Sequence, residues 1–333
     1  MKLKPVAVLG AGSWGTALAI HLARAGLDIR LWGNEPDHME SLRQQRCNQL
    51  FLPDIPFPET LSVYDNLEES LQSVAWVLLA IPSHAFRSFL SSARDLIGDV
   101  PVVWASKGLE EGTGKLLHQV ISEELPLCSA MAVISGPTFA REVAMNMPTA
   151  ITVASSSSAL ADEVSHYLHH GNFRAYTSED IVGVEVGGAL KNVLAIASGT
   201  ADGLGFGANA RAALITRGLS EVMRLGSAMG GQNETFMGLA GIGDLVLTCT
   251  DDQSRNRRTG LKLAQGMSKE DIRKEIGQEI EGVRTAREVM RLAEQYNIEM
   301  PIFEQAYKVL YEGLPPLEAV KHLLERKSTS EVV

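Results

Sequence analysis

Cysteine and basic residues are scarce in this sequence, and each shortage excludes a class of protein. The three cysteines, Cys47, Cys128 and Cys249, form no Cys-x-x-Cys pair. This spacing argues against a disulfide framework or a zinc ribbon, so we expect free thiols and no metal site. Lys and Arg total 30 against 40 Asp and Glu, a net charge of -10. A diffuse binder of nucleic acid or of an anionic membrane should be basic, so we expect neither partner.

Long apolar runs are also missing. The longest stretch without a charged residue, 143–161, contains an asparagine, a proline, two threonines and four serines, which is not the composition of a membrane span. Residues 1–5 lead straight into an apolar run and lack the ordered regions of a signal peptide. The sequence therefore predicts a cytoplasmic protein.

The chain does have enough length for two domains, with 333 residues of which 45% are hydrophobic. Up to about residue 177, short apolar runs alternate with amphipathic ones, typical of a parallel sheet with helices on both faces. We expect strands at 6–9, 29–32, 74–80, 102–105, 132–134, 150–153 and 173–176, and helices at 16–25, 86–96, 115–124 and 159–170. Beyond that point only helical periodicity remains, at 182–200, 211–229, 260–265, 282–296 and 302–310. The pattern predicts an α/β domain over residues 1–180 and an all-α domain over 181–333.

A glycine motif follows the first predicted strand. Gly10 allows a tight turn off the strand, Gly12 leaves room for a pyrophosphate, and Gly15 lets the next helix pack closely. Such a motif is weak alone, but here it follows a strand and opens an amphipathic helix, which is the context that it requires. The sequence therefore predicts a Rossmann-type, mostly parallel NAD(P)-binding domain.

The end of the second predicted strand, where the cofactor ribose is bound, carries Gly33 and Asn34, with Glu35 just beyond. An NAD-specific site normally has a carboxylate there that repels a 2′-phosphate. No carboxylate stands clearly in that position, and Arg30 should point away from it. We expect NAD(P), with a preference for NADP(H).

Lys191 stands in an apolar helical stretch, 184–193, followed by Asn192. A lysine buried there would be costly unless paired, so one interpretation is a side chain that snorkels to the surface. The other is a general base, because a desolvated lysine near other cations has a pKa lowered towards the working range. Asn192 could hold a substrate oxygen or form a structural hydrogen bond.

A second cluster follows at 238–260. Asp244, after three glycines, could pair with Lys191 or cap a helix. Ser254, Arg255 and Asn256 precede a helical run and offer hydroxyl, guanidinium and amide groups to a phosphate. A nucleic-acid patch is the alternative, but no aromatic residue interleaves and acidic residues lie alongside. We expect Arg257 or Arg258 to join the same cleft.

Two loops of the first domain complete the predicted site. Lys107 follows the strand at 102–105, and the segment 135–140 follows the next strand. In open α/β sheets, ligands bind at the carboxyl ends of the strands. Either could be only a tight loop, but two of them at this edge favour a binding site.

The residues also resemble a known family. Residues 10–19 (GAGSWGTALA), 104–110 (WASKGLE), 134–140 (ISGPTFA), 187–199 (GGALKNVLAIASG), 205–218 (GFGANARAALITRG) and 238–260 (GLAGIGDLVLTCTDDQSRNRRTG) look like the bacterial-type NAD(P)-dependent sn-glycerol-3-phosphate dehydrogenases. The resemblance implies interconversion of sn-glycerol 3-phosphate and dihydroxyacetone phosphate, supplying glycerol phosphate for phospholipid synthesis by a homodimer. It implies that Lys191 is the proton acceptor, with Lys107, Asn192, Asp244 and Thr248 around the carbon-2 oxygen.

The resemblance further implies that the substrate is held by Gly136, Thr138, Ser254, Arg255 and Asn256, with Lys107, Lys191 and Asp244. It implies cofactor contacts from Ser13, Trp14, Asn34, Lys107, Ala140, Arg255, Glu279 and Glu281. Two other functions remain open at this point: a β-hydroxyacid dehydrogenase of similar plan, and a sensor that binds NAD(P)H without turnover.

Overall fold

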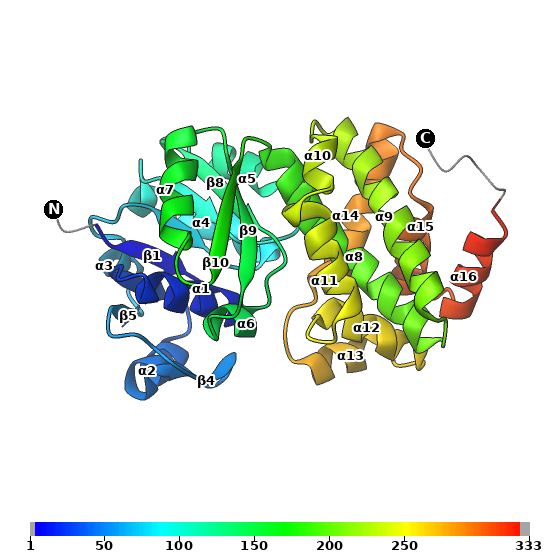
Figure 1. Ribbon diagram of the computed structural model, residues 1–333, viewed down its shortest axis with the longest axis horizontal. Helices are drawn as coiled ribbons and strands as arrows, with labels where there is room; N and C mark the ends of the chain where they lie inside the picture. Colours follow the sequence, from blue (N-terminus) through cyan, green and yellow to red (C-terminus); the bar gives the residue numbers. More distant parts are fainter. Residues whose placement is uncertain (1–3, 327–333) are drawn as a thin grey trace.

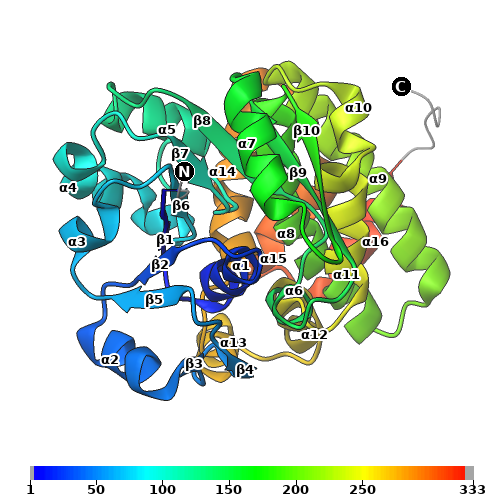
Figure 2. The same ribbon diagram turned by 60° about the vertical axis from the view of Figure 1, so that its left-hand side comes forward.

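An eight-stranded sheet fills the N-terminal half of the protein in the computed structural model, which describes residues 4–326 (Figure 1). The strand order is β10-β9-β8-β7-β6-β1-β2-β5, and Figure 2 shows β6, β1, β2 and β5 in sequence from top to bottom. Neighbouring strands are parallel except β8 and β9. This confirms the predicted Rossmann-type, mostly parallel sheet. The strands are β1 (Val6–Leu9), β2 (Ile29–Trp32), β5 (Leu61–Tyr64), β6 (Val77–Leu79), β7 (Val102–Trp104), β8 (Met131–Ser135), β9 (Thr149–Ser155) and β10 (Phe173–Ser178).

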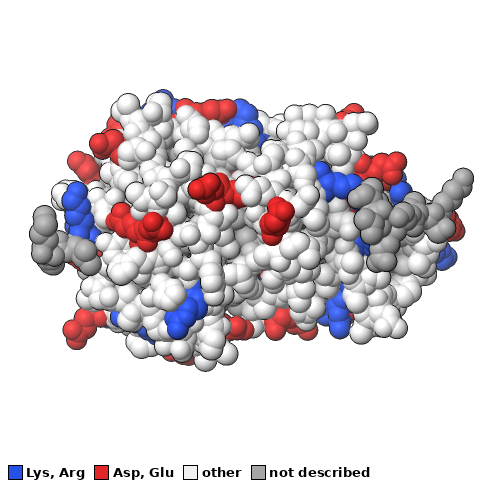
Figure 3. All heavy atoms as spheres, turned by 45° about the horizontal axis from the view of Figure 1, so that its top comes forward, with Lys and Arg blue, Asp and Glu red and all other residues white. Residues whose placement is uncertain are grey.

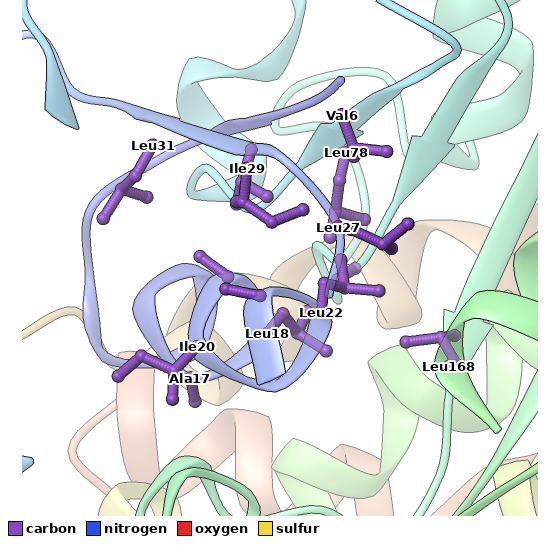
Figure 4. Close-up of a cluster of buried hydrophobic side chains, with 14 of the residues drawn as sticks. Val6, Ala17, Leu18, Ile20, Leu22, Leu27, Ile29, Leu31, Leu78 and Leu168 are labelled. Atoms are coloured by element: carbon purple, nitrogen blue, oxygen red, sulfur yellow. The ribbon is translucent and has the colours of Figure 1, made fainter. Parts of the chain in front are cut away.

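Helices cover both faces of the sheet, and the side chains of β1 show why. Val6 and Val8 belong to the core packed against α1 (Ser13–Arg24) and α7 (Ser158–Leu168), part of which Figure 4 shows. Ala7 and Leu9 belong to the opposite core, with α4 (Phe86–Ile97) and α5 (Leu117–Glu124). Successive strand residues point to opposite faces, so a wholly apolar strand requires cover on both sides. The remaining helices of this half are α2 (Pro36–Gln45), α3 (Leu67–Leu71), η1 (Ser83–Ala85) and α6 (Ala140–Ala144).

Three strands between residues 47 and 64 are absent from the sequence prediction. β3 (Cys47–Asn48) and β4 (Leu52–Pro56) form a separate two-stranded sheet, and β5 is an edge strand of the main sheet. Each is short or half exposed, and β4 contains Pro53 and Pro56. Such strands lack the continuous apolar run that reveals the central strands.

Every described element after β10 is helical, which confirms the all-α second half. Helix α8 (Ile181–Gly203) is its centre, and α9 (Ala208–Ala228), α11 (Asp244–Thr250), α12 (Arg255–Ala264) and α14 (Glu281–Tyr296) pack around it. Close contact between α8 and α12 depends on glycine, since a Cβ on Gly260 would lie 2.0 Å from the carbonyl oxygen of Ile196. The other helices are α10 (Asn233–Phe236), η2 (Leu239–Gly243), α13 (Lys269–Ile276), α15 (Pro301–Tyr311) and α16 (Pro316–Leu324).

Helix α8 is the one described helix that is long and apolar enough to cross a membrane by length and composition. Of its most apolar window, 83% is buried inside the protein, as expected for the core helix of a helical domain. On the face shown in Figure 3, lysines and arginines are few and separated from one another.

At the border between the two halves, each half contributes residues to the hydrophobic core of the other. Leu109 and Leu116, from the loop after β7, lie in the hydrophobic core of the helices. Val184 of α8 and Ala240 of η2 lie in the core of the sheet. The loops at this border are therefore held between two cores, and they carry the polar residues described next.

Candidate active site

The candidate site lies at the carboxyl ends of the parallel strands. From β1 the chain first builds outward through β2 to β5, and then returns to β6 on the other side of β1. Open α/β sheets bind their ligands at such a reversal point. The glycine motif follows β1, and Ser83, Lys107 and Gly136 follow β6, β7 and β8. The topology thus gathers four loops that are far apart in sequence.

The loop after β1 has the shape that a pyrophosphate needs. Gly10 has φ +121°, and a Cβ there would lie 2.5 Å from the carbonyl oxygen of Ala80. A Cβ on Gly15 would lie 1.9 Å from the carbonyl oxygen of Gly10. A Cβ on Gly12, by contrast, would meet nothing within 4 Å, and Gly12 begins α1 without a side-chain cap. The N-terminus of α1 is therefore open to an anion, so the loop fits the pyrophosphate of NAD(P).

The other predicted cofactor contacts of this half surround the same loop. Ser13 and Trp14 are the first residues of α1 and are partly exposed, and the buried Nε1 of Trp14 has no partner among residues 4–326. Asn34 is exposed just beyond β2. Ala140 begins α6, which packs against α1. These positions thus lie on α1, just after the strand that pairs with β1, or on the helix that packs against α1.

Arg30, the arginine of β2, does not point toward the carboxyl end of that strand. The guanidinium of Arg30 donates hydrogen bonds to the carbonyl oxygens of Glu69 (3.2 Å), Ser70 (3.3 Å) and Gln72 (2.7 Å) at the end of α3. Arg30 therefore connects α3 to the sheet. Its side chain points away from the predicted ribose position, as the sequence indicates. Glu35 is exposed at the N-terminus of α2.

Three charged side chains from three elements meet at the border of the two halves. Asp244 of α11 is fully buried, and its Oδ2 lies 2.7 Å from Nζ of Lys107, in the loop after β7. Its Oδ1 accepts a hydrogen bond from Nζ of Lys191 on α8. Nζ of Lys191 also lies 3.0 Å from Oγ1 of Thr248, one turn along α11. The side chain of Lys191 is buried rather than snorkelling, with 9% exposure.

This cluster sets the protonation of Lys191. Burial lowers its pKa to about 8, Asp244 opposes that shift, and the charge of Lys107 adds to it. Burial by itself would raise the pKa of Asp244, but the two ammonium groups outweigh that effect and the pKa is lowered. Near neutral pH the site therefore combines a stable carboxylate with a lysine that can exchange a proton.

Behind the lysines, an amide chain links three helices. Nδ2 of Asn256 donates to Oδ1 of Asn192 (3.0 Å), and the backbone N–H of Gly282 donates to Oδ1 of Asn256 (3.0 Å). Because its Oδ1 is already an acceptor, Asn192 has its Nδ2 group left for another partner. This is the orientation that a substrate oxygen next to Lys191 would need.

The start of α12 provides groups for a phosphate. Ser254 caps the helix through its hydroxyl, which accepts from the N–H of Arg257 at 3.2 Å. Nη1 of Arg255 lies 3.0 Å from Oε1 of Gln278, and burial lowers the pKa of Arg255. A partly buried guanidinium at a helix N-terminus suits a dianion.

The structure corrects the expectation for Arg257. Its guanidinium lies 2.6 Å from Asp202 and 2.9 Å from Asp252, and it also donates to the carbonyl oxygen of Cys249. Two carboxylates thus neutralise Arg257, which braces the loop before α12 and adds no free charge to the cleft. Nε of its neighbour Arg258 is buried without a partner among residues 4–326.

The loop after β8 contacts Lys107. The carbonyl oxygen of Gly136 accepts from Nζ of Lys107 at 3.3 Å and from Oγ1 of Thr138 at 3.1 Å. A Cβ on Gly136 would lie 3.0 Å from Cα of Ile151, which leaves little room for any other residue. Gly136 and Thr138 therefore lie next to the charged cluster, as predicted.

Residues at the start of α14 close the site from the helical side. Oε2 of Glu281 accepts a hydrogen bond from Oγ of Ser83 at 2.7 Å, and burial raises the pKa of Glu281. Glu279 lies 2.9 Å from Nε of Arg284. Ser83 is absent from the sequence prediction, although it follows β6 directly at the reversal point of the sheet. Its position after that strand is the feature that could have identified it.

Residues 4–326 contain no group of three His, Cys, Asp or Glu side chains that could hold a metal ion. The chemistry that this chain can supply itself is proton transfer at Lys191 and anion binding at Arg255. A redox reaction here would need the dinucleotide that the glycine loop fits.

Known proteins match this chain along almost its whole length. Residues 5–161 and 180–321 match the family models described as the N-terminus and C-terminus of NAD-dependent glycerol-3-phosphate dehydrogenase. A glycerol-3-phosphate dehydrogenase (NAD(P)+) of Thioalkalivibrio sulfidiphilus is 53% identical over 332 residues, 99% of this chain and 100% of the relative. One of Edwardsiella ictaluri is 54% identical, covering 98% of this chain and 97% of the relative. The crystal structure of a glycerol-3-phosphate dehydrogenase from Coxiella burnetii has a TM-score of 0.94 at 49% identity, covering 98% of this chain and 100% of that one.

Proposed function

This chain belongs to the NAD-dependent glycerol-3-phosphate dehydrogenase family, and we propose that it interconverts sn-glycerol 3-phosphate and dihydroxyacetone phosphate with Lys191 transferring the proton. The observation that supports this assignment most directly is the contact of Lys191 and Lys107 with the two oxygens of Asp244. That cluster lies at the carboxyl edge of a sheet whose first loop fits a pyrophosphate. The protein is thus an NAD(P)-dependent oxidoreductase.

The proton chemistry follows from the charges around Lys191. The nicotinamide of NAD(P), when bound, donates or accepts the hydride at carbon 2 of the substrate. In the reducing direction Lys191 gives its proton to the oxygen on carbon 2, and in the oxidising direction it removes that proton. Lys107 places a second positive charge beside the same oxygen, where negative charge develops. Asp244 holds the two ammonium groups apart and oriented, with Thr248 and Asn192 as further hydrogen-bonding groups.

The phosphate of the substrate is placed at the start of α12. Arg255 offers a guanidinium, Ser254 and Asn256 are beside it, and Gly136 and Thr138 close the opposite side. Binding energy gained at the phosphate, away from the reacting carbon, can position carbon 2 for the reaction. This division of labour explains why an acidic protein can bind a dianion.

The cofactor would bind across the reversal point of the sheet. Gly10, Gly12 and Gly15 would hold its pyrophosphate, and Ser13, Trp14, Asn34, Ala140, Glu279 and Glu281, with Lys107 and Arg255, would supply the remaining contacts. We propose a preference for NADP(H), since Asn34 rather than a carboxylate follows β2. Equal kcat/KM for NADPH and NADH would refute this preference.

One assay tests the function and its alternatives. Absorbance of NADPH or NADH is followed with dihydroxyacetone phosphate and, separately, with oxo acids of the hydroxyacid type. We expect oxidation with dihydroxyacetone phosphate alone, and Lys191→Ala should lower kcat at least about 100-fold, the usual effect of removing a general acid. Turnover with oxo acids would favour a β-hydroxyacid dehydrogenase, and cofactor binding without any turnover would favour a sensor.

We also propose that residues 1–180 form the cofactor domain and 181–333 the substrate domain. The end of β10 at Ser178 and the start of α8 at Ile181 support this division. We further propose a cytoplasmic homodimer that supplies glycerol 3-phosphate to phospholipid synthesis, as the resemblance to the family implies. Light scattering of the purified protein would measure its oligomeric state directly.

A further inference from the structure

We propose that Glu288 and Arg291 of α14 are positioning residues for Lys107, because they hold the loop that carries it. This loop, residues 107–116, is called here the Lys107 strap. The proposal rests on the proposed function, in which Lys107 acts at the substrate oxygen. Neither residue touches the charged cluster, so each would act only through the strap.

Glu288 and Arg291 bind the two backbone polar groups of one strap residue, Gly112. The N–H of Gly112 donates to Oε1 of Glu288 at 3.0 Å, and the carbonyl oxygen of Gly112 accepts from Nη1 of Arg291. The same Nη1 lies 3.0 Å from Oε2 of Glu288. A donor and an acceptor thus fix both polar groups of Gly112 on the surface of α14.

The burial of Glu288 indicates that this grip is more than an incidental surface contact. Its carboxylate is 2% exposed, and a carboxylate in such a place is costly unless it is paired and hydrogen-bonded. Its partners are Arg291 and the N–H of Gly112. The helix therefore maintains a buried charge whose second function is to bind the strap.

The strap is shaped to be held in this way. Gly108, Gly112 and Gly114 have φ of +145°, +85° and +70°, which favours glycine at all three positions. Leu109 and Leu116, on either side of Gly112 in the sequence, are buried in the helical core. A second ion pair joins Arg284 of α14 to Glu111. The strap therefore crosses from the sheet to α14 with its two ends fixed and Lys107 next to the first of them.

Fixing the strap fixes the ammonium of Lys107. That side chain must place Nζ against Oδ2 of Asp244 and the carbonyl oxygen of Gly136 at once. A displacement of about 1 Å at a reacting group can cost about 100-fold in rate. Loosening the strap should therefore act on turnover.

The test compares Arg291→Ala and Glu288→Gln with wild type. Arg291→Lys serves as the conservative variant, and Glu294→Gln, an exposed glutamate of the same helix, as the matched control. We expect kcat with dihydroxyacetone phosphate to fall about 10- to 100-fold in the first two. Arg291→Lys should recover most of the loss, and Glu294→Gln should show none. Hydrogen exchange over residues 108–116 should become faster in the two impaired variants.

The pH profile distinguishes positioning from general weakening of the fold. The charged and titratable groups that face Lys191 are Asp244 and Cys249 of α11 and Lys107 of the strap. Of these groups, only Lys107 would move in the variants. Its charge lowers the pKa of Lys191, so its displacement should raise that pKa. The pH above which reduction slows should therefore shift upward. Normal kcat despite faster exchange, or a loss of kcat without this shift, would overturn the proposal. Wild type is assayed first, since its failure to turn over dihydroxyacetone phosphate would refute the proposed function instead.

Discussion

Replacing Asp244 by Asn is the most informative single change in this protein. The carboxylate is 1% exposed and is shared by the ammonium groups of Lys107 and Lys191. Asparagine keeps the size of the side chain and one oxygen, but it brings an N–H₂ group that cannot accept from the second lysine. The substitution therefore removes one charge and leaves two positive groups facing each other.

The size of the effect follows from the burial of the cluster. Breaking a buried ion pair by removing one partner costs about 3–5 kcal/mol, because the other charge remains uncompensated. Lys107 is 17% exposed and keeps the carbonyl oxygen of Gly136, and Lys191 keeps Thr248. We therefore expect the free energy of unfolding to fall by about 3 kcal/mol, at the lower end of that range.

The same change should alter catalysis in a direction that the charges determine. Asp244 raises the pKa of Lys191 against the effect of burial. Without it the pKa should fall below about 8, so less Lys191 is protonated at neutral pH and reduction becomes slower. We expect kcat to fall about 100-fold or more and the pH limit of reduction to move downward.

Two measurements check this, with Asp95→Asn, an exposed aspartate of α4, as the control. Urea unfolding at neutral pH gives the loss of stability, and initial rates of dihydroxyacetone phosphate reduction over pH give kcat and its limit. The control should match wild type in both. An Asp244→Asn variant with wild-type stability and turnover would show that the carboxylate does not organise the two lysines, and the reasoning would fail.

Other predictions concern pH, the phosphate and the glycine loop. Because the pKa of Lys191 is about 8, reduction should slow as pH rises through 8 and oxidation should speed up over the same interval; parallel profiles would contradict this. Arg255→Ala should raise KM for dihydroxyacetone phosphate about tenfold or more, the loss of a hydrogen bond to a charged group, and an unchanged KM would remove Arg255 from the phosphate site. Gly12→Ala should weaken NADPH binding in a titration without lowering Tm, since its Cβ meets no protein atom. Gly15→Ala should lower Tm, since its Cβ would meet the carbonyl oxygen of Gly10 at 1.9 Å.

The sequence predicts the central strands well because their composition reflects burial on both faces. Strands β1 and β2, for example, span Val6–Leu9 and Ile29–Trp32, as the apolar runs of the sequence predict. The edge strand Leu61–Tyr64 escapes prediction because only Leu61 of it is fully buried. Edge strands satisfy one side of the sheet and leave the other to solvent, so their sequence approaches that of a loop.

The candidate site shows a similar division. Lys191 and Asp244 stand out because charged residues in apolar or glycine-rich stretches are costly unless they have a function. The prediction that Arg257 or Arg258 joins the cleft rests only on their position next to Arg255, and Arg257 instead pairs with Asp202 and Asp252. Which way an arginine points depends on helix packing, and Arg255, Arg257 and Arg258 stand at different angles around α12, so they cannot share a direction.

The net charge of -10 and the dianionic substrate are reconciled by where the acidic groups lie. Asp244 does not make the cleft negative, because it pairs with both Lys107 and Lys191. The net charge of these three side chains remains positive. Asp252 likewise pairs with Arg257, and Asp202 pairs with both Arg257 and Arg211. Field lines from a few cations in a low-dielectric cleft act on the substrate more strongly than dispersed surface charge that salt screens. A protein with a net negative charge can therefore bind a phosphate in such a cleft.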